Sequence, residues 1–421
     1  MRDDIIAALD IGSTDIRLAV AQQNRGGDGK GIQVIGAVSV PAEGISKGSV
    51  KSIEDVTSSI SECLEKAERL VGLPITNVWV GVNSPYVKCE KSRGVVAISR
   101  SDGEVTNDDV ERALEAARAL SVPPNYEIIH VLPIKFTVDK QQDIKDPVGM
   151  TGIRLEVETL IIQGLSTQIK NLTKAIFRTG IEIEDLVLSP LSAAEAVIGP
   201  KQKELGSALV NIGASTTSLA VFEEGGLLYA AVLPIGSEHI TADVAIGLRC
   251  PINLAERIKK EYGGSNSAKF DDDQEVNIEE ISKDEGINDE VKTINRKYLA
   301  EIIEARVEEI FEKIDEELKK IDRSGMLPGG VFLIGGGARL KDITDTAKQK
   351  LRLPVSLGVN KGVQTVIDKV NDLEFLNSLG LLAWGAQVQD TGDKKGFKMP
   401  NTEIIGKSVE KMKKWISSLM P

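Results

Sequence analysis

A polar turn close to the start of the sequence has the residue types of a phosphate-binding loop. It lies between two apolar runs, residues 5–9 and 16–20, and contains Asp10, Gly12, Ser13 and Thr14. Glycine lacks a Cβ atom and lets the backbone approach a ligand, and the hydroxyl and amide groups suit phosphate oxygens. The Asp10 carboxylate suits the water shell of a Mg²⁺ ion. An ordinary β-hairpin with an Asp/Gly turn would look the same, so this turn alone leaves both interpretations open.

The same design occurs again in the second half of the chain. Residues 209–222 contain an apolar run with the polar residue Asn211, then a turn, then a second apolar run. The turn consists of Gly213, Ala214, Ser215, Thr216 and Thr217. A third turn of Gly335, Gly336 and Gly337 follows the apolar residues 331–334. Because glycine permits close backbone approach, the three turns together predict a nucleotide site.

This combination resembles the superfamily of actin, DnaK-type chaperones and sugar kinases, in which two lobes clamp ATP between two such hairpins. The resemblance implies ATP and Mg²⁺ as cofactors, with Asp10 holding the metal through water. It also implies that Glu256 and Lys259, which are three residues apart on one helical face, reach the ribose. A solvated charged helix face would explain these two residues if the phosphate turns were absent.

Departures from the superfamily pattern bear on hydrolysis. Most relatives have Asp at the position of Asn211, and glycines where this chain has Ala214 and Ser215. Relatives also place a Gln or Glu that positions the attacking water near the position of Ser189. A hydroxyl cannot act as a base near neutral pH, and an amide brings no negative charge to Mg²⁺. We therefore expect nucleotide binding with at most slow hydrolysis, and the catalytic residues stay unassigned.

The composition indicates a large globular protein with room for two or more domains. The chain has 421 residues, of which 41% are hydrophobic and 27% charged, and its net charge of −12 argues against nucleic acid as a partner. The three cysteines have no metal or redox spacing, which suits a reducing compartment, and two histidines are too few for a His-rich metal site. We find no run of about 18 apolar residues and expect neither a spanning helix nor a secretory leader.

The elements that must position the turns alternate between strands and helices. Residues 52–70 and 298–321 have apolar residues at helical spacing, and residues 77–82 read as a strand. Thr106 and Asp109 predict a helix N-cap box. Several segments, GEVTNDDVERALEAA, EIIHVLPIKFTVD, DPVGMTGIRLEVE and EIIEARVEEIF, resemble FtsA, the actin-like bacterial cell division family. In that family an inserted subdomain stands where actin has a different one.

The predicted fold class is α/β: a two-lobed actin-like ATPase fold with duplicated phosphate hairpins, an inserted α+β subdomain and a C-terminal amphipathic helix. The expected parts are a first lobe (1–83, 166–195 and 360–388), the inserted subdomain (84–165), the base of a second lobe (196–243 and 326–359), its smaller subdomain (244–325), a linker (389–403) and a membrane-binding helix (404–421).

The last segment has the pattern of a basic amphipathic helix. One helical face carries Ile405, Val409, Met412, Trp415, Ile416 and Leu419, and lysines occupy most of the rest. In an acidic protein, such a helix beyond a polar linker favours binding to a membrane surface. A C-terminal helix docked on the body is the alternative.

The FtsA resemblance covers nearly the whole chain. It implies a protein that polymerises at the cytoplasmic face of the inner membrane, at the division septum, and tethers FtsZ there. The C-terminal peptide of FtsZ is expected to dock on residues 244–325, where Arg249, Arg257, Arg296 and Lys297 offer positive charge. Self-association and contacts with other division proteins follow from the same resemblance.

Three alternatives remain open from the sequence. One is a PilM-like pilus assembly protein, which shares the fold and a related insertion. Another is an MreB-like cell-shape filament, which lacks this insertion. The third is a sugar or acetate kinase, and we find no convincing substrate base for that reaction.

Overall fold

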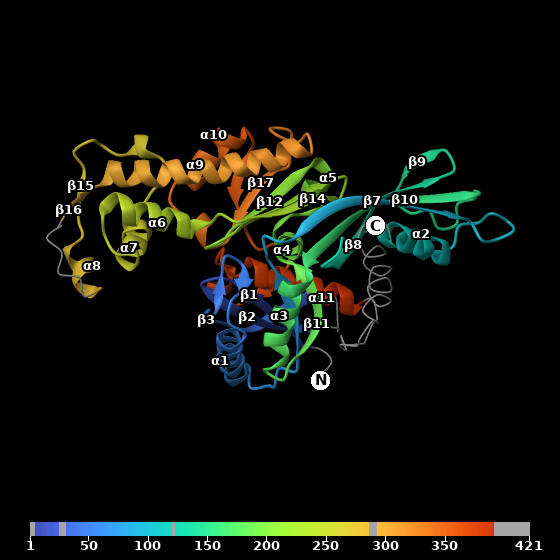
Figure 1. The fold of residues 1–421 in the computed structure, drawn as a ribbon, viewed down its shortest axis with the longest axis horizontal. Coiled ribbons are helices and arrows are strands. Elements are labelled where there is room, and N and C mark those ends of the chain that lie inside the picture. Colours follow the sequence, from blue (N-terminus) through green and yellow to red (C-terminus); the bar gives the residue numbers. More distant parts are fainter. Residues whose placement is uncertain (1–4, 25–30, 120–122, 286–292, 391–421) are drawn as a thin grey trace.

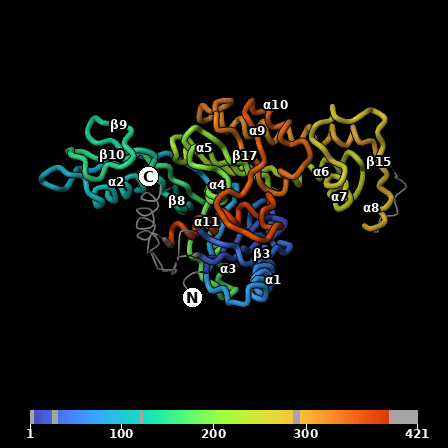
Figure 2. The backbone as a smooth tube through the Cα atoms, turned by 180° about the vertical axis from the view of Figure 1, so that it is seen from behind, coloured from blue at the N-terminus to red at the C-terminus, as the bar shows by residue number. Residues whose placement is uncertain are grey.

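The computed structural model describes residues 5–24, 31–119, 123–285 and 293–390. Figure 1 shows an elongated molecule in which residues 88–119 and 123–165 lie at one end of the long axis, and residues 237–285 and 293–295 at the other. The N-terminal strands lie near the middle, on the side away from the long helix α9 (Arg296–Lys320). Figure 2 shows the same arrangement from behind.

A six-stranded mixed sheet carries the first polar turn. Its strands are β1 (Ile5–Ile11), β2 (Asp15–Asn24), β3 (Gly31–Pro41), β6 (Asn77–Val82), β11 (Glu182–Leu188) and β19 (Gln364–Thr365). The order is β11-β6-β1-β2-β3-β19, with β1 antiparallel to β2 and parallel to β6. A small hairpin, β4 (Ile45–Ser46) and β5 (Ser49–Val50), follows β3. Strands from both ends of the described chain therefore build one sheet.

Helices cover both faces of this sheet. On one face lie α1 (Ile53–Val71) and α3 (Ser166–Phe177). The helix predicted over residues 52–70 is confirmed as α1: the Ser52 hydroxyl accepts a hydrogen bond from the Asp55 N–H, and Gly72 ends the helix in the left-handed conformation. On the other face, α4 (Ser189–Val197) and α11 (Leu376–Asp390) pack against each other within one continuous apolar core.

A five-stranded sheet carries the second and third turns. Its strands are β12 (Ser207–Ile212), β13 (Thr217–Glu223), β14 (Gly226–Leu233), β17 (Gly330–Ile334) and β18 (Val355–Leu357), in the order β14-β13-β12-β17-β18. The core that contains α4 and α11 reaches one face of this sheet, next to the short helix α5 (Pro200–Leu205). A second core joins the other face to α9, α6 (Ser237–Leu248) and α10 (Ile343–Leu351). Helices α4 and α11 thus lie between the two sheets.

A smaller group of elements caps the far end of α9. It contains α6, α7 (Ile252–Tyr262), α8 (Glu279–Asp284) and the ladder of β15 (Glu275–Asn277) with β16 (Thr293–Asn295). The polar, acidic composition of residues 265–291 predicts only short strands and loops, but α8 lies within this stretch. The sequence also predicts a helix over residues 237–245 that Gly247 ends, whereas α6 continues through Gly247 to Leu248. Helix α9 packs against α6 there, and the Ile302 side chain leaves no room for a Cβ atom.

The inserted segment forms a separate antiparallel sheet with one helix. Strands β7 (Lys88–Ala97), β8 (Tyr126–Val138), β9 (Gln141–Ile144) and β10 (Arg154–Leu165) lie in the order β7-β10-β8-β9, with α2 (Asn107–Ala119) packed on β7. Gly94 permits this contact, because a Cβ atom there would overlap the Ala113 backbone. The predicted N-cap box is confirmed, since Asp109 N–H donates to Thr106 Oγ1 (3.3 Å) and Thr106 N–H donates to Asp109 Oδ2 (2.9 Å).

One strand of the inserted sheet is longer than the sequence predicts. Residues 126–132 and 135–138 read as two strands separated by Pro133, but β8 runs through this proline. The ladder with β10 is irregular there: Thr159 pairs with Pro133 and Glu158 with Lys135, so one residue of β8 bulges. A bulge tolerates a residue that lacks a backbone N–H, and the strand continues.

The inserted sheet contacts both of the other sheets. His130 Nε2 accepts a hydrogen bond from the Leu188 N–H at the end of β11 (3.1 Å), and its ring lies 5.8 Å from that of Trp384 in α11. Burial lowers the pKa of His130 to about 4, so the imidazole is neutral, as expected for a core histidine. Strands β7, β8 and β10 also contact β14 of the five-stranded sheet.

Candidate functional site

The two polar hairpins have the same backbone geometry. Gly12 N–H donates to Asp15 O (3.0 Å), and Gly213 N–H donates to Thr216 O (2.9 Å). A side chain at either glycine would press on the carbonyl oxygen that accepts this bond. The predicted duplication is therefore present at the level of single hydrogen bonds.

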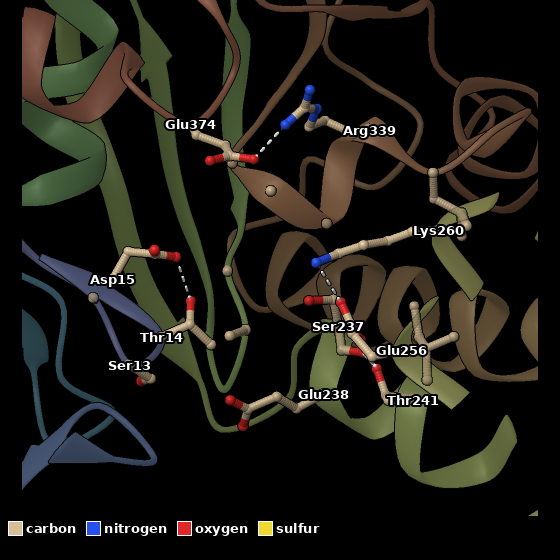
Figure 3. Close-up of a pocket in the computed structure, with 18 of the residues that line it drawn as sticks. Ser13, Thr14, Asp15, Ser237, Glu238, Thr241, Glu256, Lys260, Arg339 and Glu374 are labelled. Atoms are coloured by element: carbon tan, nitrogen blue, oxygen red, sulfur yellow. Dashed lines mark hydrogen bonds and ion pairs between the residues drawn. The ribbon is translucent and has the colours of Figure 1, made fainter. Parts of the chain in front are cut away.

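The hairpins face each other across a cavity of about 1080 Å³, and the third glycine turn closes one side of it. The predicted site residues that line the cavity are Asp10, Gly12, Ser13, Thr14, Asn211, Gly213, Ala214, Thr216, Glu256, Lys259, Gly335, Gly336 and Gly337. Figure 3 shows Thr14 on one wall and Glu256 on the opposite wall. The structure thus brings together residues that are more than 300 positions apart in the sequence.

Three predicted residues do not line the cavity. Ser215 is buried and its Oγ donates to Glu238 Oε2 (2.6 Å), while the Thr217 side chain is buried at the start of β13. Ser189 is fully buried at the start of α4, and its Oγ has no hydrogen-bond partner within the described chain. Ser215 and Thr216 lie in the turn before β13, and Thr217 is the first residue of that strand, so the hydroxyl cluster divides between the turn and the buried sheet.

Asp10 is buried, and its environment opposes ionisation. Burial raises the pKa of Asp10, although the nearby Arg17 and a hydrogen bond from Asn377 act in the opposite direction. Asn377 Nδ2 lies 3.4 Å from Asp10 Oδ2. A buried carboxylate with few protein partners suits a cation that brings its own water ligands. The described residues hold no cluster of three or more His, Cys, Asp or Glu side chains that could bind a metal.

The third turn requires glycine at its first position. Gly335 has φ +87°, and a Cβ atom there would overlap Asn211 Oδ1 and the Ile212 carbonyl. Its N–H donates to Leu373 O (3.0 Å), which ties the turn to the segment that leads into α11. The turn therefore packs directly against the second hairpin.

Glu256 and Lys259 form a hydrogen-bonded network on the wall opposite the first hairpin. Lys259 Nζ lies 2.6 Å from Glu256 Oε2 and 2.7 Å from Thr241 Oγ1, and the Thr241 hydroxyl also donates to Glu256. Burial alone raises the pKa of Glu256, but Lys259 and these hydrogen bonds outweigh burial, so the pKa is lowered. The carboxylate is therefore ionised and stays available as an acceptor towards the cavity.

Sequence reasoning missed several charged residues of the cavity. Arg17 and Asp15 of β2, Arg339 after the third turn, and Glu374 before α11 all line it. Arg17 carried a usable signal, because it is a charged residue within an otherwise apolar strand. Glu374 carried none, since its partner Arg17 is 357 positions away in the chain.

One of the four basic residues that were expected to meet an acidic peptide also borders this cavity. Arg296 lines it, with the guanidinium 4.7 Å from the Phe270 ring centre. Arg257 pairs with Glu261, Asp284 and Glu285, and Lys297 pairs with Asp272.

Comparison with known proteins places the chain in one family. The family model described as "Cell division protein FtsA" matches residues 208–380, and the model described as "SHS2 domain inserted in FTSA" matches residues 85–163. A curated FtsA of Bacillus subtilis (strain 168) is 38% identical over 405 residues, which cover 96% of this chain and 88% of that protein. The chain belongs to the FtsA family. FtsA of Pseudomonas aeruginosa (30% identical, 98% and 97% covered) and of Escherichia coli K12 (26%, 98% and 97%) are also similar.

Solved structures with lower identity share the fold of this FtsA-family chain. A PilM-PilN type IV pilus biogenesis complex matches with a TM-score of 0.64 at 15% identity and covers 90% of this chain and 98% of that chain. MreB5 of Spiroplasma citri bound to ADP matches with a TM-score of 0.53 at 13% identity (92% and 97% covered). The predicted actin-like fold and the predicted FtsA family are confirmed, and the family favours FtsA over the PilM-like and MreB-like alternatives. The predicted membrane helix, residues 404–421, lies outside the described residues.

Proposed function

We propose that this cell division protein binds ATP with Mg²⁺ between its two hairpins, assembles into filaments on the inner membrane and tethers FtsZ there. The observation that carries the proposal is the pair of hairpins with the same glycine hydrogen bond on two walls of one cavity. The MreB5 neighbour is described as bound to ADP, which supports a nucleotide in this fold.

The residues around the cavity suit a nucleoside triphosphate. The backbone amides of the glycine turns and the hydroxyls of Ser13, Thr14 and Thr216 can donate to phosphate oxygens. Arg17 supplies a positive charge beside the first hairpin, and Asp10 would hold magnesium through water. Magnesium, when bound, neutralises part of the phosphate charge. Isothermal titration of the folded chain with ATP and Mg²⁺ tests this, and the absence of heat would remove the proposal.

Hydrolysis, where it occurs, should be slow. Asn211 brings no charge towards the metal, and the Ser189 hydroxyl is buried away from the cavity. Loss of one electrostatic or acid–base contribution typically lowers a rate by about 10² or more. A measured turnover on the order of 10 per second would contradict this proposal.

The membrane contact is assigned to residues 404–420. The apolar face that includes Val409, Trp415 and Leu419 would leave water at about 25 cal/mol per Å² of buried surface. Each lysine would add about 1 kcal/mol near anionic headgroups, and salt should weaken that part. Within the described residues, no helix has both the length and the apolar character needed to cross a bilayer.

Sedimentation with anionic liposomes tests the membrane contact. The full chain should sediment, whereas Trp415→Glu and a chain truncated after Asp390 should stay in solution with nucleotide binding unchanged. Equal sedimentation of the truncated and full chains would show that the last segment is not the anchor.

The FtsZ contact is assigned to the group of elements around α6 and α9. Arg249 ends α6 in the left-handed conformation. Ile246 in the last turn of α6 is exposed, and Tyr298 of α9, also exposed, lies close to Gly247 of α6. An apolar patch beside a cation suits a peptide with both apolar and acidic residues. Titration with the FtsZ C-terminal peptide should show binding that Ile246→Ser and Arg249→Ser weaken together. Unchanged affinity in the double variant would place the peptide site elsewhere.

A further inference from the structure

A single carboxylate joins the two sides of the cavity. Glu374 Oε2 accepts a hydrogen bond from Arg17 Nη2 (2.9 Å), and Glu374 Oε1 accepts one from Arg339 Nη1 (2.5 Å). Arg17 belongs to the first hairpin in the six-stranded sheet, and Arg339 follows the third glycine turn beside the five-stranded sheet. Figure 3 shows the Glu374–Arg339 contact at the edge of the cavity, between the walls that carry Thr14 and Lys260.

Glu374 lies in the segment where the chain passes from one sheet to the other. The neighbouring residue Leu373 accepts a hydrogen bond from the Gly335 N–H (3.0 Å), and its side chain packs against the cores of both sheets. Three residues after Glu374, in the first turn of α11, Asn377 donates to Asp10. This short segment therefore contacts the first hairpin and the third turn at the same time.

The charges of this contact are partly shielded from water. The Arg17 side chain is 12% exposed and that of Glu374 is 26% exposed, whereas that of Arg339 is 54% exposed. Burial alone raises the pKa of Glu374, but Arg339 and Arg17 outweigh it, so the pKa is lowered and the carboxylate is ionised. Arg17 Nε is buried without a hydrogen-bond partner in the described part of the chain, so Arg17 depends on Glu374 and Asp15 for its pairing.

We propose that Glu374 is a positioning residue that holds the two halves closed over the nucleotide and thereby slows its dissociation. This role rests on the proposed nucleotide binding, and it assigns control of nucleotide release to the Glu374 carboxylate. Another link across the cavity, from Asn83 Nδ2 to Thr216 Oγ1 (3.3 Å), is uncharged. A partly buried charged contact resists separation more than an exposed or neutral one. Loss of the Glu374 contact should therefore change the rate at which the nucleotide dissociates and not the rate at which it associates.

The test is a stopped-flow measurement on the full chain with Mg²⁺ and a fluorescent MANT-ATP probe. After mixing with excess ATP, Glu374→Gln should release the probe about 10-fold faster than the wild type, with association unchanged within about twofold. Glu223→Gln is the matched control. Glu223 is 30% exposed and binds Arg323 through two contacts (2.9 and 2.7 Å), but neither residue lines the cavity. This variant should release the probe at the wild-type rate.

A second variant separates positioning from a general loss of structure. Arg339→Gln removes the more exposed partner and should speed release in the same direction, and the double variant should add little to either single change. Wild-type release rates in both single variants, or slower release in Glu374→Gln, would show that Glu374 does not hold the cavity closed. A wild-type chain that gives no fluorescence change would instead contradict nucleotide binding itself.

Discussion

The two phosphate hairpins share their backbone but differ in their chemistry. In the first, Asp10 lies opposite Arg17 across the two strands, and in the second, Asn211 lies opposite Ser218. The same glycine hydrogen bond closes both turns. The fold thus repeats a backbone geometry for phosphate oxygens, but only the first of the two hairpins carries formal charges beside its turn. We therefore expect metal and charge recognition at the first hairpin and neutral donors at the second.

A second likeness explains how both polar residues reach the cavity. Asp10 pairs with Gly81 on the neighbouring parallel strand, and a Cβ atom on Gly81 would lie 3.4 Å from Asp10 Oδ1. Asn211 meets Gly335 in the same way, one residue beyond its partner Ile334 in β17. A glycine therefore borders each polar side chain: Gly81 lies on the strand next to Asp10, and Gly335 lies just after β17, where a Cβ atom would overlap Asn211. The two sites thus depend on the residues beside the hairpins as much as on the turns.

The largest effect should follow from removing the charge that distinguishes the first hairpin. Asp10→Asn gives it the amide of the second, and ATP affinity in Mg²⁺ should fall on the order of 100-fold, because the water-mediated metal contact loses its negative charge. Affinity in EDTA should change much less. Titration calorimetry with and without Mg²⁺ measures both, and Asp143→Asn, in the inserted sheet, is the control. An equal loss with and without the metal would mean that Asp10 supports only the fold.

The shared backbone geometry can be broken on each side in turn. An added Cβ atom would lie 2.7 Å from Asp15 O in the first hairpin and 3.0 Å from Thr216 O in the second. Gly12→Ala should therefore destabilise by about 2 kcal/mol and Gly213→Ala by about 1 kcal/mol, because a backbone atom must shift. Urea unfolding of the two variants checks this order. A reversed order would indicate that the second hairpin is the more rigid one.

The second hairpin can also be given the charge that it lacks. Asn211→Asp is nearly isosteric, and it should raise the rate of phosphate release from ATP about 10-fold if the missing charge limits hydrolysis. A malachite-green phosphate assay measures the change. The superfamily pattern also suggests Ser189→Glu, but this second substitution should not be combined with the first. Position 189 is fully buried, so the new carboxylate would lie in the core. An unchanged rate in Asn211→Asp would assign the slow step elsewhere.

The smallest effect should be the contribution of Asp10 to the pH dependence of stability, which the uncharged Asn211 of the second hairpin cannot make. Burial raises the pKa of Asp10 above its usual 3.8, so the folded state binds this proton more tightly than the unfolded state. Stability from this group therefore falls as pH rises through the interval between the two pKa values. At pH 7 and without nucleotide, Asp10→Asn should melt about 2 °C higher than the wild type, and the difference should vanish in acid. A lower melting temperature at pH 7 would contradict an unfavourable buried charge.

Local patterns predicted much of the fold. Apolar runs around glycine and hydroxyl residues located both hairpins, and the spacing of Val56, Ile60 and Cys63 located α1. These features depend on neighbours a few residues away, which sequence reasoning can see. Two local predictions failed. A strand break at Pro133 was expected, but a bulge opposite β10 lets the strand continue. A helix end at Gly247 was expected, but packing against the Ile302 side chain overrides the local preference of glycine.

The turns of the candidate site and three of its charged residues, Asp10, Glu256 and Lys259, were predictable, but its ion pairs around Glu374 were not. Gly213 and Thr216 face the cavity as expected, but Thr217 begins β13 and is buried in the core. The ion pairs of Arg17 and Arg339 with Glu374 join segments that are distant in sequence. Only the assembled sheets bring these charges together, so a single sequence gives no register for them.

The composition of the six-stranded sheet has a consequence for biosynthesis. Its β3 strand pairs with β19 through Gln33 and Gln364, and the helix that covers one of its faces, α11, ends at Asp390. Strands β12 to β18 and the inserted strands β7 to β10 each come from one continuous stretch of chain. During translation, the N-terminal strands emerge first but complete their sheet last, after the ribosome has added more than 300 further residues. The face of β1 and β2 that α11 covers thus stays exposed longest, and this face is where a chaperone would be needed.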